Sequence, residues 1–465
     1  MNSRSEIKDN AMSTPGDNTA AIARPPSHGA SYGRYVLWML LIINFLAFLD
    51  RQILNILAEP IKQELKLSDT QLGLLTGLAF AFLYTFLGLP IARLAERANR
   101  VGIIGISLAI WSAFTIACGF ANSYAQLALA RVGVGVGEAG CSPASHSLIS
   151  DYVPREKRAS ALGFYSMGVP LGTMAGLAFG GLIADAYGWR VAIVVAGAPG
   201  ILVAILARLT IRDTRRQHIA DRGKASPPAP ALGLAMRELT SKRAFWWAAL
   251  AASSSAFLAY GHNAFYASFF LRNHAQGIAE IAATVSGGSL KASGFLGIAL
   301  GLILGLGGLI GSFLGGRMCD HFAKRDPRAN VLLPAGAFLV SLPFVLVAVF
   351  IPHTLVALLM LGPAILLKTF WYGPIFATVQ NVVQPGTRAT AAAILLGMMN
   401  LIGLGLGPVT VGIFSDAFAG TLGPSEGLRW GLAVTAIMGI VPPACLWMAS
   451  RTLVSETVED GPSTA

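Results

Sequence analysis

Residues 35–57 read YVLWMLLIINFLAFLDRQILNIL and are apolar over most of their length. As an α-helix that rises about 1.5 Å per residue, this stretch can cross the hydrocarbon of a bilayer, which takes roughly 20 residues. Two charged residues, Asp50 and Arg51, lie side by side within it. Charges at that depth are costly unless they are paired or face water. The stretch therefore predicts a membrane helix whose charge pair serves a structural or functional purpose.

The rest of the chain has the composition of an integral membrane protein. Of its 465 residues, 54% are hydrophobic and 12% are charged, whereas soluble domains carry about 25% charged residues. The mean hydropathy is +0.62. The apolar runs are continuous, which excludes the strands of a membrane barrel, because those alternate over about 10 residues. The sequence therefore predicts an all-α membrane protein.

Twelve apolar segments are predicted, at residues 35–58, 70–92, 101–121, 125–150, 158–184, 191–211, 244–270, 293–316, 331–351, 354–383, 389–415 and 429–450. An even number places both termini on one side, and most of the 34 Lys and Arg residues fall in the termini and the even-numbered loops. By the positive-inside rule, that side is the cytoplasm. Topology thus explains the net charge of +11, so membrane lipids, and no nucleic acid, are the predicted charged partners.

A polar stretch divides the segments six and six. An N-terminal six-helix bundle is predicted over residues 34–212 and a C-terminal one over 243–452. The cytoplasmic linker 213–242 has the pattern of a short amphipathic helix near its end. Residues 1–33 and 453–465 are predicted to be cytoplasmic tails, the first of them disordered because it is rich in Ser, Pro, Gly and Asn.

The sequence contains no catalytic or metal-binding motif. Its four cysteines are scattered through apolar segments without a metal or redox spacing. It has no nucleophile elbow, nucleotide loop or zinc-protease motif. We therefore predict that the protein is not an enzyme, holds no metal and needs no cofactor except a coupling proton.

The loops after the second and eighth segments repeat one motif. Residues 92–100 read ARLAERANR and residues 316–325 read GRMCDHFAKR, so in each a small residue precedes an acid by four positions and basic residues follow. The same arrangement in both halves indicates an internal duplication. A set of conformational latches at the cytoplasmic face is predicted from Glu96, Arg97, Arg100, Asp320 and Lys324. The alternative is that these charges only set the topology.

These motifs resemble those of the major facilitator superfamily. The repeated loop resembles its small-x-x-x-Asp-Arg-x-Gly signature, with Glu96 and Asn99 as departures, and residues 131–135, RVGVG, resemble its Arg-x-x-x-Gly motif. With FLDRQ at residues 48–52 and GEAGCSP at 137–143, the chain looks like the spinster branch over roughly residues 35–450. The resemblance implies two six-helix bundles around a central cavity, alternating access, and export of a sphingolipid or lysophospholipid.

Segments five and eight carry glycines four residues apart, at positions 168, 172, 176 and 180, at 297, 301 and 305, and at 307, 311 and 315. This spacing places each set on one helix face, where small residues let helices approach closely. In the superfamily that the chain resembles, segments five and eight meet at the bundle interface. We therefore predict that these faces pack and rock against each other; the alternative is that membrane helices are simply rich in Gly.

Four charged residues of the N-terminal half are predicted to form the proton-coupling site. Counting along the helices places Arg131 at the depth of Asp50, and Glu138 lies two turns beyond Arg131 on the same face. An apolar site raises the pKa of a carboxyl group and a nearby guanidinium lowers it, so moving an arginine between partners would switch an acid between its two forms. We predict that Asp50, with Arg131 as its partner, and Glu138 carry the proton, controlled by Arg51 and Arg131. A purely structural ion network is the alternative.

The C-terminal half has one charge near mid-membrane, Lys368, and no acid at the same depth. We predict that it binds the anionic head of a substrate, with Trp371 and Tyr372 as cavity walls; the alternative is that it snorkels to the interface. The predicted substrate site is completed by His262, Asn263, Tyr266 and Asn400. His262 could instead only pack or hydrogen-bond, and the two asparagines could instead bridge helices.

Taken together, the sequence predicts a monomeric, proton-coupled secondary transporter of a bacterial inner membrane. Its predicted substrate is a small amphipathic, lipid-like molecule with an anionic or zwitterionic head. A facilitator without proton coupling, or an exporter of drugs or organic anions, is the alternative function. A sensor or scaffold that has lost transport is the alternative from another class.

Overall fold

The computed structural model describes residues 30–95, 98–154, 157–213 and 232–458, and every regular element among them is helical. The predicted disordered tail up to residue 29, most of the predicted linker and the last seven residues, 459–465, lie outside the described residues. So do Glu96 and Arg97 of the predicted latches.

The N-terminal half consists of α1 (Ala30–Leu65), α2 (Asp69–Gly73), the π-helix η1 (Leu74–Leu78), α3 (Ala79–Ala95), α4 (Arg100–Gly119), α5 (Tyr124–Glu138), α6 (Cys141–Tyr152), α7 (Arg158–Ser166), α8 (Gly168–Tyr187) and α9 (Trp189–Thr210). After α11 (Leu232–Ser241), the C-terminal half consists of α12 (Arg243–Asn273), α13 (Ala275–Ser286), α14 (Ala292–Ala323), α15 (Ala329–Phe350), α16 (Thr354–Lys368), α17 (Tyr372–Asn381), α18 (Arg388–Met398), the π-helix η3 (Met399–Leu406), α19 (Gly407–Leu422), α20 (Pro424–Ile437), the 3₁₀-helix η4 (Met438–Ile440) and α21 (Val441–Glu456).

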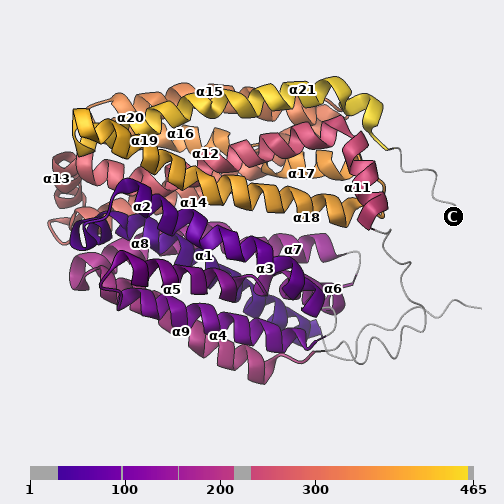
Figure 1. The fold of residues 1–465 in the computed structure, drawn as a ribbon, viewed down its shortest axis with the longest axis horizontal. Coiled ribbons are helices and arrows are strands. Elements are labelled where there is room, and N and C mark those ends of the chain that lie inside the picture. Colours follow the sequence, from indigo (N-terminus) through magenta and orange to yellow (C-terminus); the bar gives the residue numbers. More distant parts are fainter. Residues whose placement is uncertain (1–29, 96–97, 155–156, 214–231, 459–465) are drawn as a thin grey trace, which may run out of the picture.

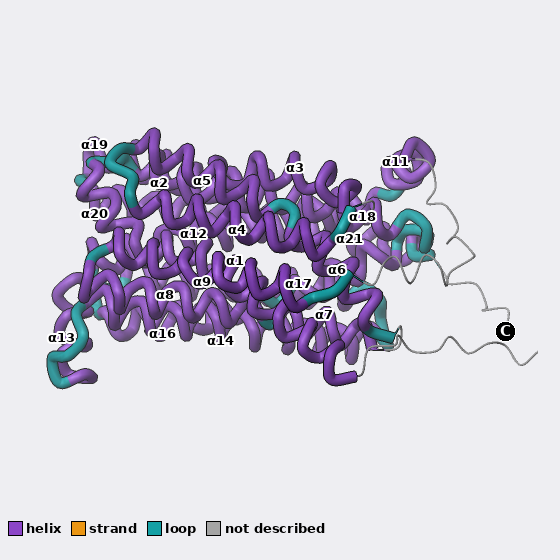
Figure 2. The backbone as a smooth tube through the Cα atoms, turned by 90° about the horizontal axis from the view of Figure 1, so that it is seen from below, coloured by secondary structure: helices purple, strands orange, loops and turns teal. Residues whose placement is uncertain are grey.

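The two halves lie side by side as two bundles (Figure 1), and their helices run roughly parallel to a common long axis (Figure 2). Ten stretches of the described chain are long and apolar enough to cross a membrane, by length and composition. The two remaining predicted segments, 125–150 and 244–270, are formed by α5 with α6 and by α12. The predicted twelve-segment, all-α architecture is therefore confirmed.

The bundles have two distinct ends, which are named here by their elements. At the linker end lie α11 and the last turns of α21, and at the opposite, α13 end lie α13 and the start of α2 (Figure 1). The sequence analysis predicts an amphipathic helix where α11 lies, but it does not predict α13. Residues 271–292 lie between two of the predicted segments, and no helix is predicted there.

Polar residues begin several helices by capping their first backbone N–H groups. Ser68 Oγ accepts from the backbone N–H of Gln71, and Gln71 Oε1 accepts in return from the N–H of Ser68, which is a capping box at the start of α2. Asn99 caps α4 and Ser123 caps α5 in the simpler one-sided way. These caps fix where the helices carrying the buried charges begin.

Two of the twelve predicted segments break next to a charged residue. The fourth segment stops being helical at Glu138, the last residue of α5, and resumes at Cys141. The tenth stops at Lys368, the last residue of α16, and resumes at Tyr372. The sequence analysis treats both segments as continuous, because apolar content alone does not distinguish a broken helix from a straight one.

The glycine stripe of segment five does not face segment eight as predicted. It packs instead on α1 within the same half: a Cβ atom added to Gly172 would lie 2.5 Å from the Phe45 carbonyl oxygen, and one added to Gly176 would lie 2.6 Å from that of Leu49. The four-residue spacing correctly identifies a close-packed face, but it carries no information about which neighbour covers that face.

Segments five and eight nevertheless meet, through the glycines of α14. A Cβ atom on Gly297 would lie 2.3 Å from the Leu177 carbonyl oxygen of α8, and one on Gly301 would lie 2.8 Å from that of Met174. The second glycine set of α14 turns to segment ten, since Gly311 packs against the Leu366 carbonyl. The helix α14 therefore packs closely, backbone against backbone, on both the opposite half and its own bundle.

Candidate functional site

The buried charges of the N-terminal half include one close ion pair between α1 and α5. Arg51 Nη2 lies 2.5 Å from Glu138 Oε2, and Arg51 Nε donates to the same oxygen over 2.7 Å. Glu138 is 2% exposed, and its other oxygen is buried without a hydrogen-bond partner. The carboxylate thus depends on Arg51 for its neutralisation.

Asp50 is not paired with Arg131, although the sequence analysis predicts that pair. One oxygen of Asp50 accepts from the Thr115 hydroxyl of α4 at 3.0 Å, and the other is buried without a partner. Arg131 donates from Nε to the Leu75 carbonyl over 3.5 Å and still interacts electrostatically with Asp50. The predicted pairing is wrong because consecutive residues point about 100° apart on a helix, which turns Asp50 to α4 and leaves Arg51 to α5.

Aromatic rings surround the Arg51 guanidinium. Its Cζ atom lies 4.7 Å from the ring centre of Phe80, 4.9 Å from that of Tyr84 and 5.0 Å from that of Phe48. The Cζ atom of Arg131 lies 5.3 Å from the same Phe80 ring. Such contacts attract a cation to the face of a ring and help to keep it charged away from water.

The glycines around Glu138 admit neighbouring helices. A Cβ atom on Gly135 would lie 2.6 Å from the Phe80 carbonyl oxygen of α3, and one on Gly137 would lie 2.6 Å from the Trp111 backbone nitrogen of α4. These glycines therefore provide the space in which α3 and α4 approach α5 closely.

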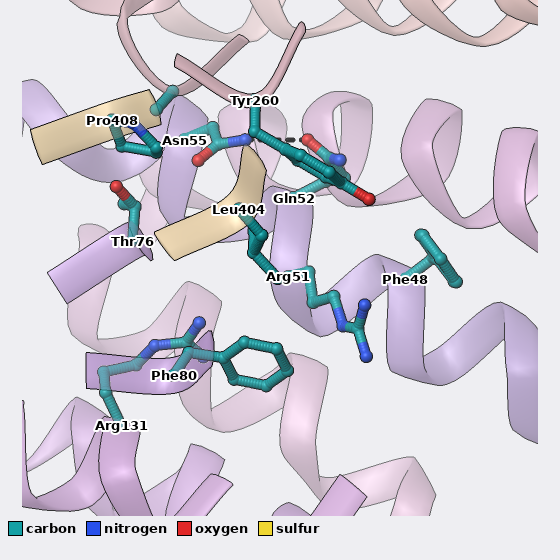
Figure 3. Close-up of a pocket in the computed structure, with 11 residues that line it drawn as sticks. Phe48, Arg51, Gln52, Asn55, Thr76, Phe80, Arg131, Tyr260, Leu404 and Pro408 are labelled. Atoms are coloured by element: carbon teal, nitrogen blue, oxygen red, sulfur yellow. Dashed lines mark hydrogen bonds between the residues drawn. The ribbon is translucent and has the colours of Figure 1, made fainter. Parts of the chain in front are cut away.

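A small cavity lies between the two halves beside these charges. Figure 3 shows its N-terminal wall, with Arg51, Gln52 and Asn55 from α1 and Arg131 from α5, and its C-terminal wall, which includes Tyr260 of α12. Asn55 Nδ2 donates to Gln52 Oε1 at 2.7 Å. The walls of the cavity therefore carry two guanidinium groups, of which that of Arg51 is paired with Glu138, and several neutral polar groups beside apolar ones.

A second buried polar cluster lies in the C-terminal half, around the predicted Lys368. This residue is 4% exposed, and its ammonium lies 3.2 Å from His262 Nδ1. His262 Nε2 lies 3.0 Å from the Thr435 hydroxyl, and the Tyr266 hydroxyl lies 3.4 Å from Nδ1. An ammonium can only donate, so with Lys368 charged the His262 ring is neutral and carries its proton on Nε2.

Lys368 has no carboxylate partner among the described residues; the partner resolved for it is His262. The cluster thus offers a positive charge that an incoming anion could neutralise. It does not line the cavity beside the N-terminal charges, whose C-terminal wall is made by Tyr260, Ala264, Leu404 and Pro408. The structure therefore places the predicted substrate lysine and the predicted proton-coupling charges in separate clusters.

The other predicted substrate residues have different surroundings. Trp371 is 5% exposed, whereas Tyr372 is 50% exposed, and their ring centres are 5.4 Å apart. Asn263 has a buried side-chain oxygen without a hydrogen-bond partner. Asn400 is partly buried in η3. Asn263 thus has a buried polar atom that a ligand could satisfy.

Among the predicted latch residues that the structure describes, no contact that joins the two halves is resolved. Arg100 Nη2 lies 2.6 Å from Asp151 and 2.8 Å from Asp213, both in the N-terminal half. Asp320 and Lys324 are exposed. Arg100 therefore ties α4 to α6 and to the chain after α9, within one bundle.

The contacts that join the halves gather at the α13 end instead. Arg272 of α12 lies 2.7 Å from Glu59 of α1 and 2.8 Å from Asp69 of α2. Asp416 of α19 caps α2, since its carboxylate accepts from the backbone N–H groups of Asp69 and Thr70 at 2.9 and 2.8 Å. We call Glu59, Asp69, Arg272 and Asp416 the clamp.

Sequence reasoning missed both the clamp and the polar wall of the cavity. Gln52 and Asn55 follow Arg51 on α1 at a helical spacing, which was a usable signal. The clamp residues are at segment ends in four separate parts of the chain, where charges are common. Nothing in the spacing along the sequence relates them.

Comparison with known proteins gives a consistent set of matches. The family model of the Major Facilitator Superfamily matches residues 40–408. An MFS-type efflux pump of Mycolicibacterium smegmatis is 31% identical over 444 residues, which cover 93% of this chain and 96% of the relative. Protein spinster homolog 1 of Mus musculus is 28% identical, over 88% of this chain and 80% of the relative.

A solved structure shares the fold over nearly the whole length. It is the crystal structure of a bacterial homologue of the human lysosomal transporter Spinster, in an inward-facing and unoccupied conformation. The TM-score is 0.82, with 33% sequence identity, and the match covers 93% of this chain and 100% of the other.

Proposed function

The chain belongs to the Major Facilitator Superfamily, in its spinster-like branch, and on this premise we propose that it is a proton-coupled secondary transporter of amphipathic anions. Members of this family are membrane transporters and not enzymes. The observation that carries the proposal is the buried Arg51–Glu138 pair beside a half-satisfied Asp50, with Arg51 in the wall of the central cavity.

Two buried carboxyl groups with unequal partners are suited to proton binding and release. Glu138 is neutralised by Arg51, while Asp50 has one hydrogen bond and one unpartnered oxygen. A carboxyl oxygen without a donor is one that a proton can occupy without displacing a bond. Because arginine stays charged throughout, Arg51 and Arg131 supply the field and the carboxyl groups supply the proton.

Alternating access is supported by where the halves are joined. The clamp closes the α13 end, while Arg100 at the linker end is bonded within its own half. The solved homologue is described as inward-facing. We therefore assign the clamp to the outer side and the linker end, with both termini, to the cytoplasmic side, in agreement with the positive-inside distribution.

The substrate class is inferred from the charges and from the relatives. The cavity carries two cations, and Lys368 adds a third positive site in the other half, which favours a ligand with an anionic or zwitterionic head. A lysophospholipid or sphingoid-type substrate with an apolar tail is what the resemblance to spinster proteins implies, and we propose it on that ground. One chain provides both walls of the cavity, so a monomer in a bacterial inner membrane suffices.

A second candidate function is export of drugs or other organic anions. The relative from Mycolicibacterium smegmatis is named an efflux pump and is 31% identical. The same cavity would serve either function, because apolar walls with a few polar groups do not select one tail chemistry. Transport assays with lysolipids and with organic dyes in parallel distinguish the two.

The first test is proton movement in proteoliposomes that contain a pH-sensitive dye. Wild-type protein should acidify or alkalinise the lumen when lysophosphatidylglycerol is added. Asp50→Asn and Glu138→Gln should reduce this signal by about 10-fold or more, the range found when one positioned proton-transfer group is lost.

Glu280→Gln, which removes an exposed carboxylate of α13, is the matched control and should keep the signal. If the Asp50 and Glu138 variants fold and retain full pH-gradient-dependent transport, the proton-coupling assignment is wrong. Lipid flux without any proton signal in the wild type would indicate a facilitator.

A further inference from the structure

We propose that Phe80 is a positioning residue of the proton-coupling network, whose ring keeps the Arg51 and Arg131 guanidinium groups apart and so keeps Arg131 away from the carboxylate that Arg51 serves. The inference rests on the proposed proton coupling and extends it to a neutral residue.

The Phe80 ring lies between the two cations. Its centre is 4.7 Å from Arg51 Cζ and 5.3 Å from Arg131 Cζ, and Figure 3 shows the two guanidinium groups on either side of the ring. Both distances are within the roughly 6 Å over which a ring face attracts a cation. Phe80 is 1% exposed, so little water screens these contacts.

The position of the ring is fixed by its backbone and by a neighbouring ring. The Phe80 carbonyl packs on α5 at Gly135, where a Cβ atom would lie only 2.6 Å away. The ring also stacks on Tyr84, with centres 5.2 Å apart and planes inclined by 21°. The backbone of Phe80 is therefore held against α5, and its ring is held against that of Tyr84.

Removing the ring would let the guanidinium groups redistribute. Both Asp50 and Glu138 have a buried oxygen without a hydrogen-bond partner, and each such oxygen attracts any donor that can reach it. Arg131 is now held by Phe80 and by a long bond to the Leu75 carbonyl. Without Phe80, we expect Arg131 to reach the carboxylate that Arg51 serves, so that Glu138 would have two cationic partners in place of one.

The same ring also lines the cavity in which we propose that the substrate binds. Phe80 lines the central cavity with Arg51 and Arg131, so a ligand that enters the cavity contacts the ring that spaces the two cations. Displacement of one ring would then change the surroundings of both guanidinium groups at once. This gives the transporter a direct physical link between substrate occupancy and proton binding.

The test measures how the opening of the α13 end depends on pH. Spin labels at Tyr187→Cys and Leu422→Cys, exposed residues at the ends of α8 and α19, report the distance between the halves. The four native cysteines are buried and should remain unlabelled. Full-length protein in lipid nanodiscs is measured by electron–electron double resonance between about pH 5 and pH 9, the range in which buried carboxyl groups titrate.

We expect Phe80→Tyr to keep the wild-type midpoint, because it keeps the aromatic face. Phe80→Leu should move the midpoint by about one pH unit or flatten the curve, as the loss of two cation–π contacts predicts. If the leucine variant does not fold, Phe80→Met, which also lacks a ring, is measured in its place. Phe338→Leu is the matched control, since Phe338 is equally buried in the C-terminal half, with no cation resolved at its ring.

Three results would overturn the proposal. The first is a Phe80→Leu curve that coincides with wild type, and the second is a Phe338→Leu change of the same size. The third is a Phe80→Tyr variant that behaves like Phe80→Leu. A flat wild-type curve is a different failure, because it removes proton coupling itself and the role of Phe80 with it.

Discussion

The buried charged residues of this protein have unequal sets of partners, and we infer that this difference decides which of them can exchange a proton or bind a ligand. Glu138 is bound by a guanidinium, whereas Asp50 is bound by one hydroxyl. Lys368 is bound by a neutral imidazole. A buried charge with a full set of partners is a structural element, and one with an incomplete set can exchange a proton or bind a ligand.

Replacement of Lys368 tests the substrate charge directly. We expect Lys368→Met to weaken binding of lysophosphatidylglycerol by about 30-fold or more, because loss of one partner in a buried charge contact costs roughly 2–5 kcal/mol. Binding of the zwitterionic lysophosphatidylcholine should change much less. Isothermal titration calorimetry on purified protein measures both.

The control for this experiment is Lys157→Met, which removes an exposed lysine of the N-terminal half. Equal weakening of the two lipids by Lys368→Met would show that the lysine supports the fold of the cavity and does not recognise the anion.

At the scale of elements, the two helix breaks give each half a charge at a helix C-terminus. α5 ends at Glu138 and α16 ends at Lys368, in corresponding segments of the two halves. The C-terminal end of a helix carries partial negative charge, so it favours the ammonium of Lys368 and disfavours the carboxylate of Glu138. This is a physical reason why Glu138 needs Arg51, whereas Lys368 persists with only a neutral partner.

The contact of α8 with α14 can be tested through one glycine. A Cβ atom on Gly297 would lie 2.3 Å from the Leu177 carbonyl oxygen, and backbone cannot yield as a side chain can. We expect Gly297→Ala to lower the free energy of unfolding by about 1–3 kcal/mol, as overpacking does. Thermal unfolding in detergent measures the change.

Gly336→Ala in α15 is the comparison variant, because an added Cβ atom there meets nothing within 4 Å. It should unfold at the same temperature as wild type or slightly higher, since alanine is the better helix former. If both variants unfold alike, the close approach of α8 and α14 is not needed for stability.

At the scale of the whole molecule, the two halves are held together mainly at one end. The clamp joins α1 and α2 of one half to α12 and α19 of the other, and Arg272 at its centre is 7% exposed. Removing one member of a buried ion network costs roughly 3–5 kcal/mol, because the remaining charges stay buried. A single clamp substitution can therefore change which end of the transporter is open.

We expect Arg272→Gln to open the α13 end. The population of long distances between labels at positions 187 and 422 should rise by about 100-fold or more relative to the closed form, the factor that corresponds to the lost clamp energy. Arg237→Gln, an exposed substitution on α11, should leave the distance distribution unchanged. An unchanged distribution in Arg272→Gln would mean that other contacts hold this end closed.

The membrane class, the twelve segments, the division into halves and the charges within the apolar segments could be predicted from the sequence alone. These features depend on the composition of short stretches of sequence and on the depth of a residue in the membrane. Both can be counted along the chain, because they set the hydropathy of a segment and the cost of a buried charge. The family resemblance rested on equally local motifs, and the comparisons confirmed it.

Only the tertiary structure decided which groups meet. The sequence predicted Asp50 with Arg131, but the structure joins Arg51 to Glu138 and gives Asp50 to Thr115. It also turned the α8 glycines to α1 and assembled the clamp from four separate segment ends. Which side chains pair depends on how each helix is rotated about its axis. A shift of one residue turns a side chain by about 100°, so the pairing cannot be obtained by counting residues along the chain.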